Sequence, residues 1–292
     1  MKTQKSFDID EGIGTLFIVP TPIGNLEDIT IRAINTLKTV DLIAAEDTRN
    51  TKKLLNHFEI HQTLISYHEH SQEKRANFLV DELKQGRDIA LVSDAGMPAI
   101  SDPGTELVQE VIGQGLPVVT LPGANAGLCA LVGSGLPTEN FYFYGFLPRK
   151  KKDRAQAFEL LQKITTTFIL YESPYRLIET LNDIKNELGN RKIAVARELT
   201  KRFEEYIRGT VDEVMEWSKD GTIKGEFCII IEGGLMGFTE ETNWWETLSI
   251  IEHVDRYIEK ENITSKEAIK KVALERKIPK REVYQNYHLE QE

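Results

Sequence analysis

The chain has 292 residues, enough for two domains of ordinary size, and its 40% hydrophobic content is sufficient for buried cores. Its formal net charge of −10 argues against a protein that coats nucleic acid through overall electrostatic attraction, although a local basic site is compatible with it. The first dozen residues are polar and no apolar run approaches the roughly 20 residues that span a bilayer, so we expect a cytoplasmic protein without signal peptide or membrane helix.

Apolar strands alternate with amphipathic helices in the first part of the chain. The predicted strands are 15–19, 41–45, 63–67, 88–92 and 117–121, and the predicted helices are 28–39, 51–58, 72–85 and 105–114. In the last helix Leu107, Val108, Val111 and Ile112 recur at helical spacing. This βαβ pattern predicts an α/β domain over residues 13–122 with a mostly parallel sheet and helices on both faces.

The segment Leu91–Gly104 runs from an apolar strand directly into carboxylates and turn-forming residues. Gly96 and Gly104 allow close backbone approach or a positive φ, while Pro98 and Pro103 stiffen the loop. In an open α/β sheet, ligands bind outside the carboxyl ends of the strands. We therefore predict a preorganised ligand-facing loop; the alternative is an ordinary connection between strand and helix.

A second α/β domain is predicted over residues 123–236. Its strands are 141–146, 168–171, 192–196, 206–209 and 226–231, and its helices are 152–164, 174–188 and 211–217. Segment 201–206 leads into a hairpin-type pairing, which indicates a mixed sheet. Residues 122–127, followed by the helical 128–132, form the predicted hinge between the domains, and a cleft is expected there. Cys129 and Cys228 are predicted to be buried small hydrophobic residues because both lie in apolar surroundings.

The tail, residues 243–292, is predicted to be all-helical. Helices are expected near 244–260, 265–276 and 279–287, with a capped start at Thr264–Glu267. The break around Ile278-Pro279 between two short helices suggests a module similar to a helix-turn-helix. A helical cap or dimer arm that touches no nucleic acid is the alternative.

Several common sites are excluded or disfavoured. The segment after the first strand, Val19–Leu26, lacks the Gly-rich dinucleotide fingerprint, and no P-loop motif occurs. No nucleophile elbow supports Ser-His-Asp catalysis. His68 and His70 share one face of a strand without an identified third ligand, so we expect loop or substrate-rim residues and no metal site.

Two local basic clusters stand out against the acidic total. Arg149–Arg154 carries five positive charges against one negative, and Arg197–Arg202 contains adjacent Lys201 and Arg202. Taken alone, either cluster is compatible with an ordinary solvated face.

A set of motifs resembles the bacterial 16S rRNA cytidine 2′-O-ribose methyltransferases, members of the tetrapyrrole methylase group (class III) of S-adenosylmethionine enzymes. The motifs are Val19–Leu26, Ala45–Arg49, Ser66–His70, Ser93–Gly104, Leu121–Ala126, Ser134–Pro137, Gly145–Pro148, Tyr171–Arg176 and Ala196–Lys201. They cover roughly residues 14–233 in order, and their combination is specific although each motif alone is weak. The tail resembles the small helical C-terminal module of the same family.

The resemblance implies an S-adenosylmethionine cleft between two α/β domains of a homodimer that acts on a decoding-centre cytidine of 16S rRNA, free or in the 30S subunit. The cofactor contacts that it implies are Ile23, Gly24, Asp94, Ala95, Gly96, Met97, Asn125, Ala126, Tyr171, Ala196 and Cys228. Asn125 stands where many relatives have Ser, and Met97 where many have Thr. Both departures keep the loops small, so they affect particular hydrogen bonds rather than the site.

A ribose hydroxyl is a poor nucleophile near neutral pH, so the site is expected to offer a proton acceptor or a cation for the developing alkoxide. Loop position nominates Glu46, Glu172 and Lys201, with Arg49 and Arg197 as electrostatic partners. We predict Lys201 and Glu172 as catalytic residues. The alternative for each is a structural ion pair, such as Glu172 with Arg176.

For RNA binding, we predict that Glu46, Arg49, Lys150, Lys151, Lys152 and Arg197 contact the substrate. The three lysines neutralise phosphates, and Tyr67 or Tyr175 stacks on a splayed base.

Two other functions remain open. A methyltransferase of the same fold acting on a tetrapyrrole or another small substrate needs neither the basic run nor the helical tail. A non-catalytic RNA- or ribosome-binding protein is disfavoured because every cleft loop keeps its small residues.

Overall fold

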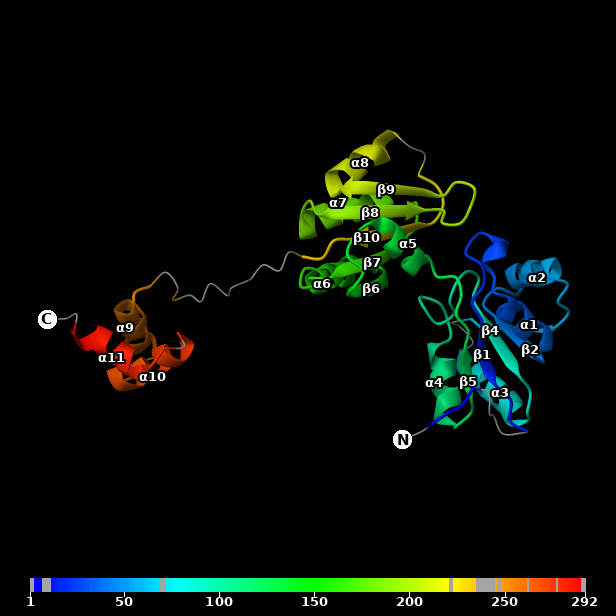
Figure 1. The fold of residues 1–292 in the computed structure, drawn as a ribbon, viewed down its shortest axis with the longest axis horizontal. Helices are drawn as coiled ribbons and strands as arrows, with labels where there is room; N and C mark the ends of the chain where they lie inside the picture. The colour runs from blue at the N-terminus through cyan, green and yellow to red at the C-terminus, as the bar shows by residue number, and fades with distance from the viewer. Residues whose placement is uncertain are drawn as a thin grey trace. The chain divides into compact units, whose positions relative to one another are not determined.

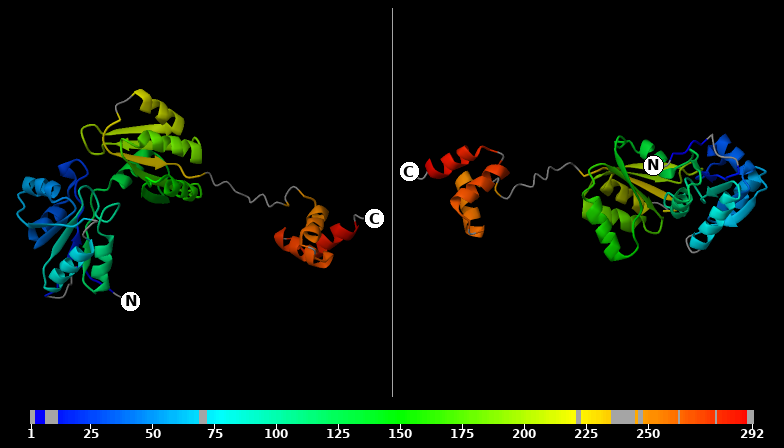
Figure 2. Two further views of the ribbon diagram at one scale, coloured as in Figure 1. Left: turned by 180° about the vertical axis from the view of Figure 1, so that it is seen from behind. Right: turned by 90° about the horizontal axis from the view of Figure 1, so that it is seen from below.

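The computed structural model of the chain describes residues 3–6, 12–68, 72–220, 223–234, 245, 248–261, 263–276 and 278–289. The chain forms two compact units, Met1–Gly234 and Leu235–Glu292. The first unit carries two β-sheets, and the described part of the second is helical (Figures 1 and 2). The predicted division near residue 122 falls between the two sheets, within the first unit, and stays a prediction.

The first sheet is five-stranded and parallel, with the order β3-β2-β4-β1-β5. Its strands are β1 (Leu16–Ile18), β2 (Leu42–Ala45), β3 (Thr63–Ser66), β4 (Ile89–Val92) and β5 (Val118–Thr120). β2 and β4 are buried at every position because helices cover both faces of the sheet, which explains their uninterrupted apolar sequences. The predicted parallel α/β sheet is confirmed.

Helices of the first half pack on opposite faces of this sheet (Figure 1). They are α1 (Ile31–Thr39), α2 (Thr48–His57), α3 (Gln72–Lys84) and α4 (Thr105–Gly113), with the short 3₁₀ helix η1 (Leu26–Asp28) before α1. Leu37 of α1 and Leu55 of α2 share a core with Ile43 of β2. Leu79 of α3 and Leu107 of α4 share another core with strands β1, β2 and β4. The sheet is thus enclosed, and its carboxyl edge is left for a ligand.

The second sheet is mixed and has the order β6-β7-β10-β8-β9. Its strands are β6 (Phe141–Phe146), β7 (Thr167–Glu172), β8 (Lys192–Arg197), β9 (Glu205–Thr210) and β10 (Phe227–Ile231). β6 and β7 are parallel, whereas β10 lies antiparallel between β7 and β8. β8 and β9 form the predicted antiparallel hairpin, so the mixed sheet is confirmed.

The two faces of the second sheet are covered by different helices. These are α5 (Ala126–Ser134), α6 (Lys151–Leu161), α7 (Leu177–Leu188) and α8 (Val211–Asp220). Phe158 of α6, Leu181 of α7 and Val214 of α8 pack on one face. Ala130 and Leu131 of α5 pack on the other face, against Ile169 of β7 and Ile230 of β10 among other residues. This second face adjoins the site described below.

The predicted burial of both cysteines is wrong for one of them. Cys228 is buried in β10, but Cys129 is exposed on α5. The reason is helical geometry: Ala130 and Leu131 point to the sheet, so Cys129 turns to the outside. In the part of the chain that the structure describes, no helix is both long and apolar enough to cross a membrane.

The second unit contains α9 (Ile250–Glu261), α10 (Ser265–Glu275) and α11 (Lys280–Leu289) around buried Val254, Ile269 and Val283. The Thr264 backbone N–H donates to the Glu267 carboxylate at 3.1 Å, which confirms the predicted start of α10. Of the predicted helix 244–260, residue 244 lies outside the described residues, and the helix begins at Ile250, later than predicted. Ser249 precedes it, and its backbone N–H donates to Glu252 at 2.7 Å.

Candidate active site

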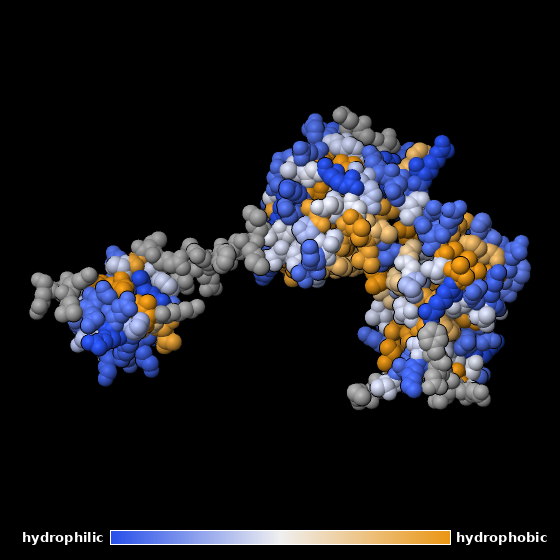
Figure 3. Space-filling model, in the orientation of Figure 1, coloured by the Kyte–Doolittle hydropathy of each residue, from blue (hydrophilic) through white to orange (hydrophobic). Residues whose placement is uncertain are grey.

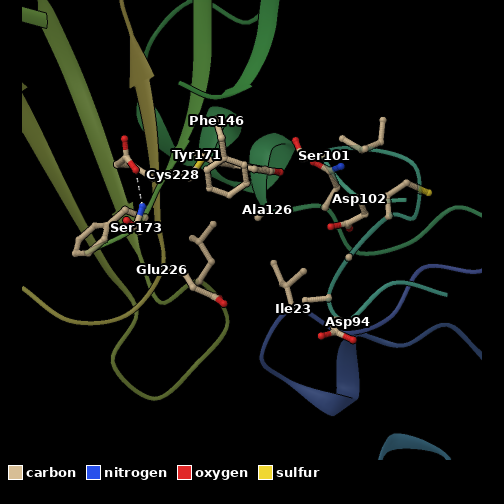
Figure 4. A pocket seen from close by; sticks show the side chains of 18 of the residues that line it. Ile23, Asp94, Ser101, Asp102, Ala126, Phe146, Tyr171, Ser173, Glu226 and Cys228 are labelled. Carbon is tan, nitrogen blue, oxygen red and sulfur yellow. Dashed lines mark hydrogen bonds between the residues drawn. The ribbon is translucent and has the colours of Figure 1, made fainter. Parts of the chain in front are cut away.

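Loops from both sheets enclose a cavity of about 400 Å³ at the predicted cleft, within the size range of small-molecule sites. One side comes from the loops after β1, β2 and β4, and the other from the ends of β7, β8 and β10. In Figure 4, Tyr171 and Cys228 lie on one side, facing Ile23, Asp94 and Asp102 on the other. The start of α5, with Asn125 and Ala126, completes the wall.

The loop after β4 is held in a strained conformation. The backbones of Thr21 and Gly96 exchange two hydrogen bonds of 2.9 Å, which join this loop to the loop after β1. Ala99 and Ser101 have φ angles of 65° and 61°, a region that non-glycine residues rarely adopt. Such strain persists only where the surroundings enforce it, and it is concentrated at functional sites. The backbone therefore presents residues 100–102 to the cavity in one arrangement.

Tyr171 forms the aromatic wall. The Gly127 backbone N–H donates to the Tyr171 hydroxyl oxygen at 2.9 Å, and Phe143 and Phe146 meet its ring edge-on. Burial, with a smaller effect from Cys228, raises the pKa of Tyr171 to about 12. The phenol therefore keeps its proton at neutral pH and has it available for a ligand.

The cavity also contains a group of carboxylates. Asp94 accepts hydrogen bonds from the Asp47 backbone N–H at 3.2 Å and from the Asn50 amide at 3.1 Å. Burial raises the pKa of Asp102 to about 7, and the negative charges of Glu46 and Asp94 add to this effect. Asp102 is therefore poised to exchange a proton near neutral pH.

Nearly all residues predicted to bind the cofactor are brought together. Those that line the cavity are Ile23, Asp94, Ala95, Gly96, Met97, Asn125, Ala126, Tyr171, Ala196 and Cys228. Gly24 is outside the lining. A Cβ atom at Gly24 would overlap the Lys201 side chain and lie 3.0 Å from the Leu199 carbonyl oxygen, so this glycine lets the two loops meet.

The two predicted catalytic residues are engaged in structural contacts. The buried Glu172 carboxylate accepts from the Thr180 hydroxyl at 2.6 Å and from the Ser173 backbone N–H at 2.8 Å, with Arg176 3.7 Å away. Lys201 donates to Glu198 at 2.9 Å and to the cavity residue Glu226 at 3.0 Å. Burial lowers the pKa of Lys201, but its hydrogen bonds to Glu198 and Glu226 outweigh burial and raise it, so the ammonium form persists.

Of the predicted substrate contacts, Glu46 lines the cavity, whereas the two arginines do not. Arg49 pairs with Asp47 at 2.6 Å, and its hydrogen bonds lower the pKa of that carboxyl to about 2. Arg197 donates to the Lys224 carbonyl at 2.9 Å and to Glu205 at 3.2 Å, which ties it to neighbouring loop and strand residues.

The basic run is divided by the start of α6. Lys150, Lys151 and Lys152 are exposed there. Arg154 is buried instead, donating to Asp183 at 2.6 Å and to Thr180 at 2.9 Å. The sequence predicted one basic surface, and this is wrong for Arg154 because its position on the helix faces α7.

The two tyrosines predicted to stack on a base differ in their exposure to solvent. Tyr67 is 1% exposed and packs in the first sheet's core, so it is not accessible for stacking on a base. Tyr175 is 96% exposed and is accessible. Of the possible histidine ligands, His70 lies outside the described residues.

Sequence reasoning missed several lining residues. They are Ile100, Ser101, Asp102, Phe146, Ser173, Pro174, Leu199, Glu226 and Phe227. The loop after β4 carries a usable signal for Ser101 and Asp102, because both lie within Leu91–Gly104, the segment predicted to face a ligand. Glu226 and Phe227 enter the cavity only because β10 lies between β7 and β8, which no local pattern indicates.

Comparison with known proteins agrees with this architecture. Residues 15–215 match the family model for tetrapyrrole (corrin/porphyrin) methylases. The structure of uroporphyrin-III C-methyltransferase from Thermus thermophilus, complexed with S-adenyl homocysteine, superposes with a TM-score of 0.52 at 17% identity, covering 74% of this chain and 97% of that chain. Fold and cavity thus define a methyltransferase of the tetrapyrrole methylase class.

Closer relatives extend over the full length. The chain is 57% identical to ribosomal RNA small subunit methyltransferase I of Halalkalibacterium halodurans, covering 99% of this chain and 100% of that protein. It is 54% identical to the protein of the same name from Bacillus subtilis, with 100% of both covered. The chain belongs to the ribosomal RNA small subunit methyltransferase I family.

Proposed function

We propose that the protein transfers a methyl group from S-adenosylmethionine to the ribose 2′-oxygen of a decoding-centre cytidine, nucleotide 1402, in 16S rRNA. The observation that carries this proposal is the cavity at the junction of the two sheets, whose walls are built from the motifs on which the sequence resemblance rests. A protein with this activity works where ribosomal subunits are found, which supports the predicted cytoplasmic location.

The cavity residues fit S-adenosylmethionine in size and chemistry. The backbone of Asp94–Met97 and the small side chains of Ala126 and Ala196 leave room for a compact ligand, and Tyr171 and Phe146 offer aromatic contacts. The carboxylates of Glu46 and Asp102 suit a cationic group. The cofactor, when bound, supplies a methyl group on a positively charged sulfur.

The chain must accept the proton that the ribose hydroxyl loses on methylation. The carboxylates of Glu172 and Asp94 already accept two hydrogen bonds each, and Glu226 pairs with Lys201. Asp102 faces the cavity and has a pKa of about 7, which suits proton transfer near neutral pH. We assign it the role of proton acceptor in place of Glu172, which holds the turn between β7 and α7.

Lys201 serves this reaction as a cation. Its raised pKa rules it out as a proton acceptor near neutral pH, while its pairing with Glu226 holds the ammonium group at the cavity wall. There it orients Glu226 and favours negative charge developing on the substrate oxygen.

RNA binding is assigned to Lys150, Lys151 and Lys152 together with exposed Tyr175. A helix start ordinarily favours negative charge, so lysines there oppose the dipole of α6 and are available for phosphates. Arg49 and Arg197 are expected to contribute less to substrate binding than the three lysines, because each already pairs with a carboxylate.

The proposed homodimer is supported by apolar surface on the second sheet. Val132 and Leu128 on α5 are 77% and 48% exposed. Figure 3 shows hydrophobic surface gathered in this region. Exposed apolar patches of this kind are typical of interaction sites.

The full-length relatives favour rRNA over the small-substrate alternative. The structure of uroporphyrin-III C-methyltransferase covers only 74% of this chain, whereas the rRNA methyltransferases match it from end to end, tail included. The cavity loops keep their small residues, such as Gly96, Ala126 and Ala196, and a cavity therefore remains. This disfavours the alternative of a non-catalytic RNA- or ribosome-binding protein.

Mass-spectrometric mapping of ribose methylation tests the proposal. We expect 30S subunits from cells lacking the protein to lack the methyl group on this cytidine, and the purified protein with S-adenosylmethionine to restore it. Methylation of a base atom or another nucleotide contradicts the assignment. Free 16S rRNA in parallel shows which form is the substrate, and absence of calorimetric S-adenosylmethionine binding favours the non-catalytic protein.

A further inference from the structure

A second cavity adjoins the proposed cofactor site. It has a volume of about 350 Å³ and lies between the loop after β1 and one face of α2. Thr21, Gly24 and Leu26 contribute from the loop, and Asp94 lines both cavities. The two cavities therefore meet at Asp94.

The face of α2 on this cavity carries one lysine and no carboxylate. Asn50, Lys53 and His57 line it and recur at helical spacing. The helix contains Arg49, Lys52 and Lys53 but no acidic residue, in a chain whose net charge is −10. Arg49 is paired with Asp47, whereas no described carboxylate lies within ion-pair distance of Lys53.

The one carboxylate of this cavity is held by the start of α2. The two Asp94 oxygens accept hydrogen bonds from the Asp47 backbone N–H at 3.2 Å and the Asn50 amide at 3.1 Å. These bonds direct the Asp94 charge to the helix N-terminus, where it is favourable. Lys53 and His57 lie further along the same helix face, one and two turns on, and present their donors to the cavity.

The remaining lining is partly apolar. Leu26 is 39% exposed and lies across from Leu54 of α2. A site that combines a lysine, a histidine, an amide and two partly exposed leucines suits a nucleotide, which presents a charged phosphate beside a sugar and a base. Single-stranded RNA is commonly bound in this way, with cations on the backbone and apolar or aromatic side chains on the bases.

We infer that this second cavity binds the nucleotide next to the methylated one, with Lys53 and His57 contacting its phosphate. The inference rests on the proposed function, because the neighbouring nucleotide reaches this cavity only when the target ribose occupies the first. Lysine acts at such a site as a point charge on phosphate oxygen, so the contact positions the strand without reading its sequence.

The test compares Lys53→Gln with Lys52→Gln, which removes the same charge from the adjacent position of α2, outside the cavity. Both lysines are exposed, so neither change is expected to affect folding. We expect Lys53→Gln to weaken binding of 30S subunits roughly 5- to 10-fold and to reduce the slope of log affinity against log salt by about 0.7, the effect of one single-strand phosphate contact. Lys52→Gln is expected to change affinity less than 2-fold. His57→Gln is expected to act in the same direction as Lys53→Gln, and calorimetric binding of S-adenosylmethionine stays unchanged in all three.

Equal effects of the two lysine changes, whether large or absent, overturn the inference, since they mean diffuse attraction or no contact. A loss of S-adenosylmethionine binding in Lys53→Gln overturns it as well, because the second cavity then serves the cofactor. The proposed function fails separately, if the unaltered protein does not methylate 30S subunits or rRNA at all.

Discussion

At the scale of single residues, the contacts of the Glu172 and Asp102 carboxyl groups indicate which of them has a structural role and which is available for chemistry. Glu172 and Asp102 both face the cavity and are both acidic. Glu172 is held by Thr180 and the Ser173 backbone, whereas Asp102 is destabilised as an anion by burial and by neighbouring Glu46 and Asp94. We therefore expect carboxyl groups to have two different roles in one pocket, a structural one at Glu172 and, as proposed, proton acceptance at Asp102.

Asp102→Asn tests this distinction in activity. We expect rRNA methylation to fall roughly 100-fold or more, because a proton acceptor is lost, while binding of S-adenosylhomocysteine is retained. The unaltered protein is expected to gain methylation activity as pH rises through about 7, because Asp102 then loses its proton. The activity of the variant should not show this rise with pH. Glu172→Gln should instead lower stability, by about 1–3 kcal/mol, through a disrupted buried hydrogen-bond network. Full activity of Asp102→Asn across this pH range contradicts the assignment.

The same pKa predicts a stability effect with a definite sign. The folded protein holds the Asp102 proton up to about pH 7, whereas the unfolded chain releases it near 3.8. The stabilisation from this protonated form is complete below pH 3.8 and is lost as pH rises through 7. Asp102→Asn mimics the neutral acid, so its advantage in unfolding free energy should grow up to about pH 7 and then level off.

Gly24→Ala examines the contact between the two loops. The added methyl group overlaps Lys201 and crowds Thr200 and Leu199, so we expect a loss of about 1–3 kcal/mol in unfolding free energy and weaker cofactor binding. Gly113→Ala at the end of α4 is the control, since a Cβ there meets nothing within 4 Å. Denaturant titration of both variants measures the free energy of unfolding. Equal values for the two variants would mean that the loops can accommodate the extra methyl group without loss of stability.

At the scale of elements, α6 shows how a charge run is divided by a helix. Its first turn exposes Lys151 and Lys152 after the N-cap Lys150, while Arg154 turns inward to Asp183. The period of the helix, and not the run itself, decides which charges reach solvent.

Replacing Lys150, Lys151 and Lys152 by Glu should weaken rRNA binding and flatten its salt dependence. Acidic residues at a helix start are favoured by the helix dipole, typically by about 0.3–1 kcal/mol each, so the variant should fold at least as stably as the original. A loss of binding then cannot come from unfolding. Filter binding at several salt concentrations and thermal unfolding check the two parts, and unchanged binding would leave the patch as a solvated face.

The three-helix unit contains a titratable group of its own. His253 is fully buried between the rings of Trp245 and Tyr257, with its Nδ1 accepting from Arg276 at 3.2 Å and its Nε2 lying 3.1 Å from Glu275. Burial lowers its pKa, and the charge of Arg276 lowers it further although Glu275 acts in the opposite direction.

We therefore expect the helical unit to lose stability in mild acid. Because the folded pKa of His253 lies below the unfolded value of 6.5, its contribution is complete above 6.5 and is lost as pH falls below it. Hydrogen exchange of α9 in the full chain, corrected for intrinsic rates, should show reduced protection at pH 5.5 relative to pH 7.5. In His253→Gln this pH dependence should disappear; if it persists, another group is responsible.

At the scale of the whole molecule, we predict that the proposed homodimer forms through the apolar surface of α5. Val132→Asp places a charge on the most exposed apolar residue of that helix, so we expect the dimer to dissociate at concentrations where the original protein remains dimeric. Ile112→Asp on α4 is the control, since Ile112 is 47% exposed on the other sheet's helices. Sedimentation velocity distinguishes monomer from dimer for both variants. If Val132→Asp remains dimeric, the interface does not include this surface of α5.

Much of the site could be predicted because loop chemistry is local. Glycine, proline and small residues after each strand mark the ligand edge of the sheet, and the motifs shared with the family nominated most of the cavity lining. Two details depend on partners from distant segments: Gly24, which stays a predicted cofactor contact, lies against Lys201, and Arg154 is buried against Asp183. Asp102 was overlooked individually since its raised pKa depends on burial and on Glu46 and Asp94.

The amino-acid order alone determined the succession of strands and helices, the parallel first sheet and the place of the cleft, because hydrophobic periodicity and turn residues act over a few positions. Only the tertiary structure decided which carboxylate has a raised pKa, which cations reach the surface and that Glu226 joins the pocket. Those outcomes depend on burial and on neighbours brought together from separate strands, and electrostatic energies respond to distance in space rather than to separation along the chain.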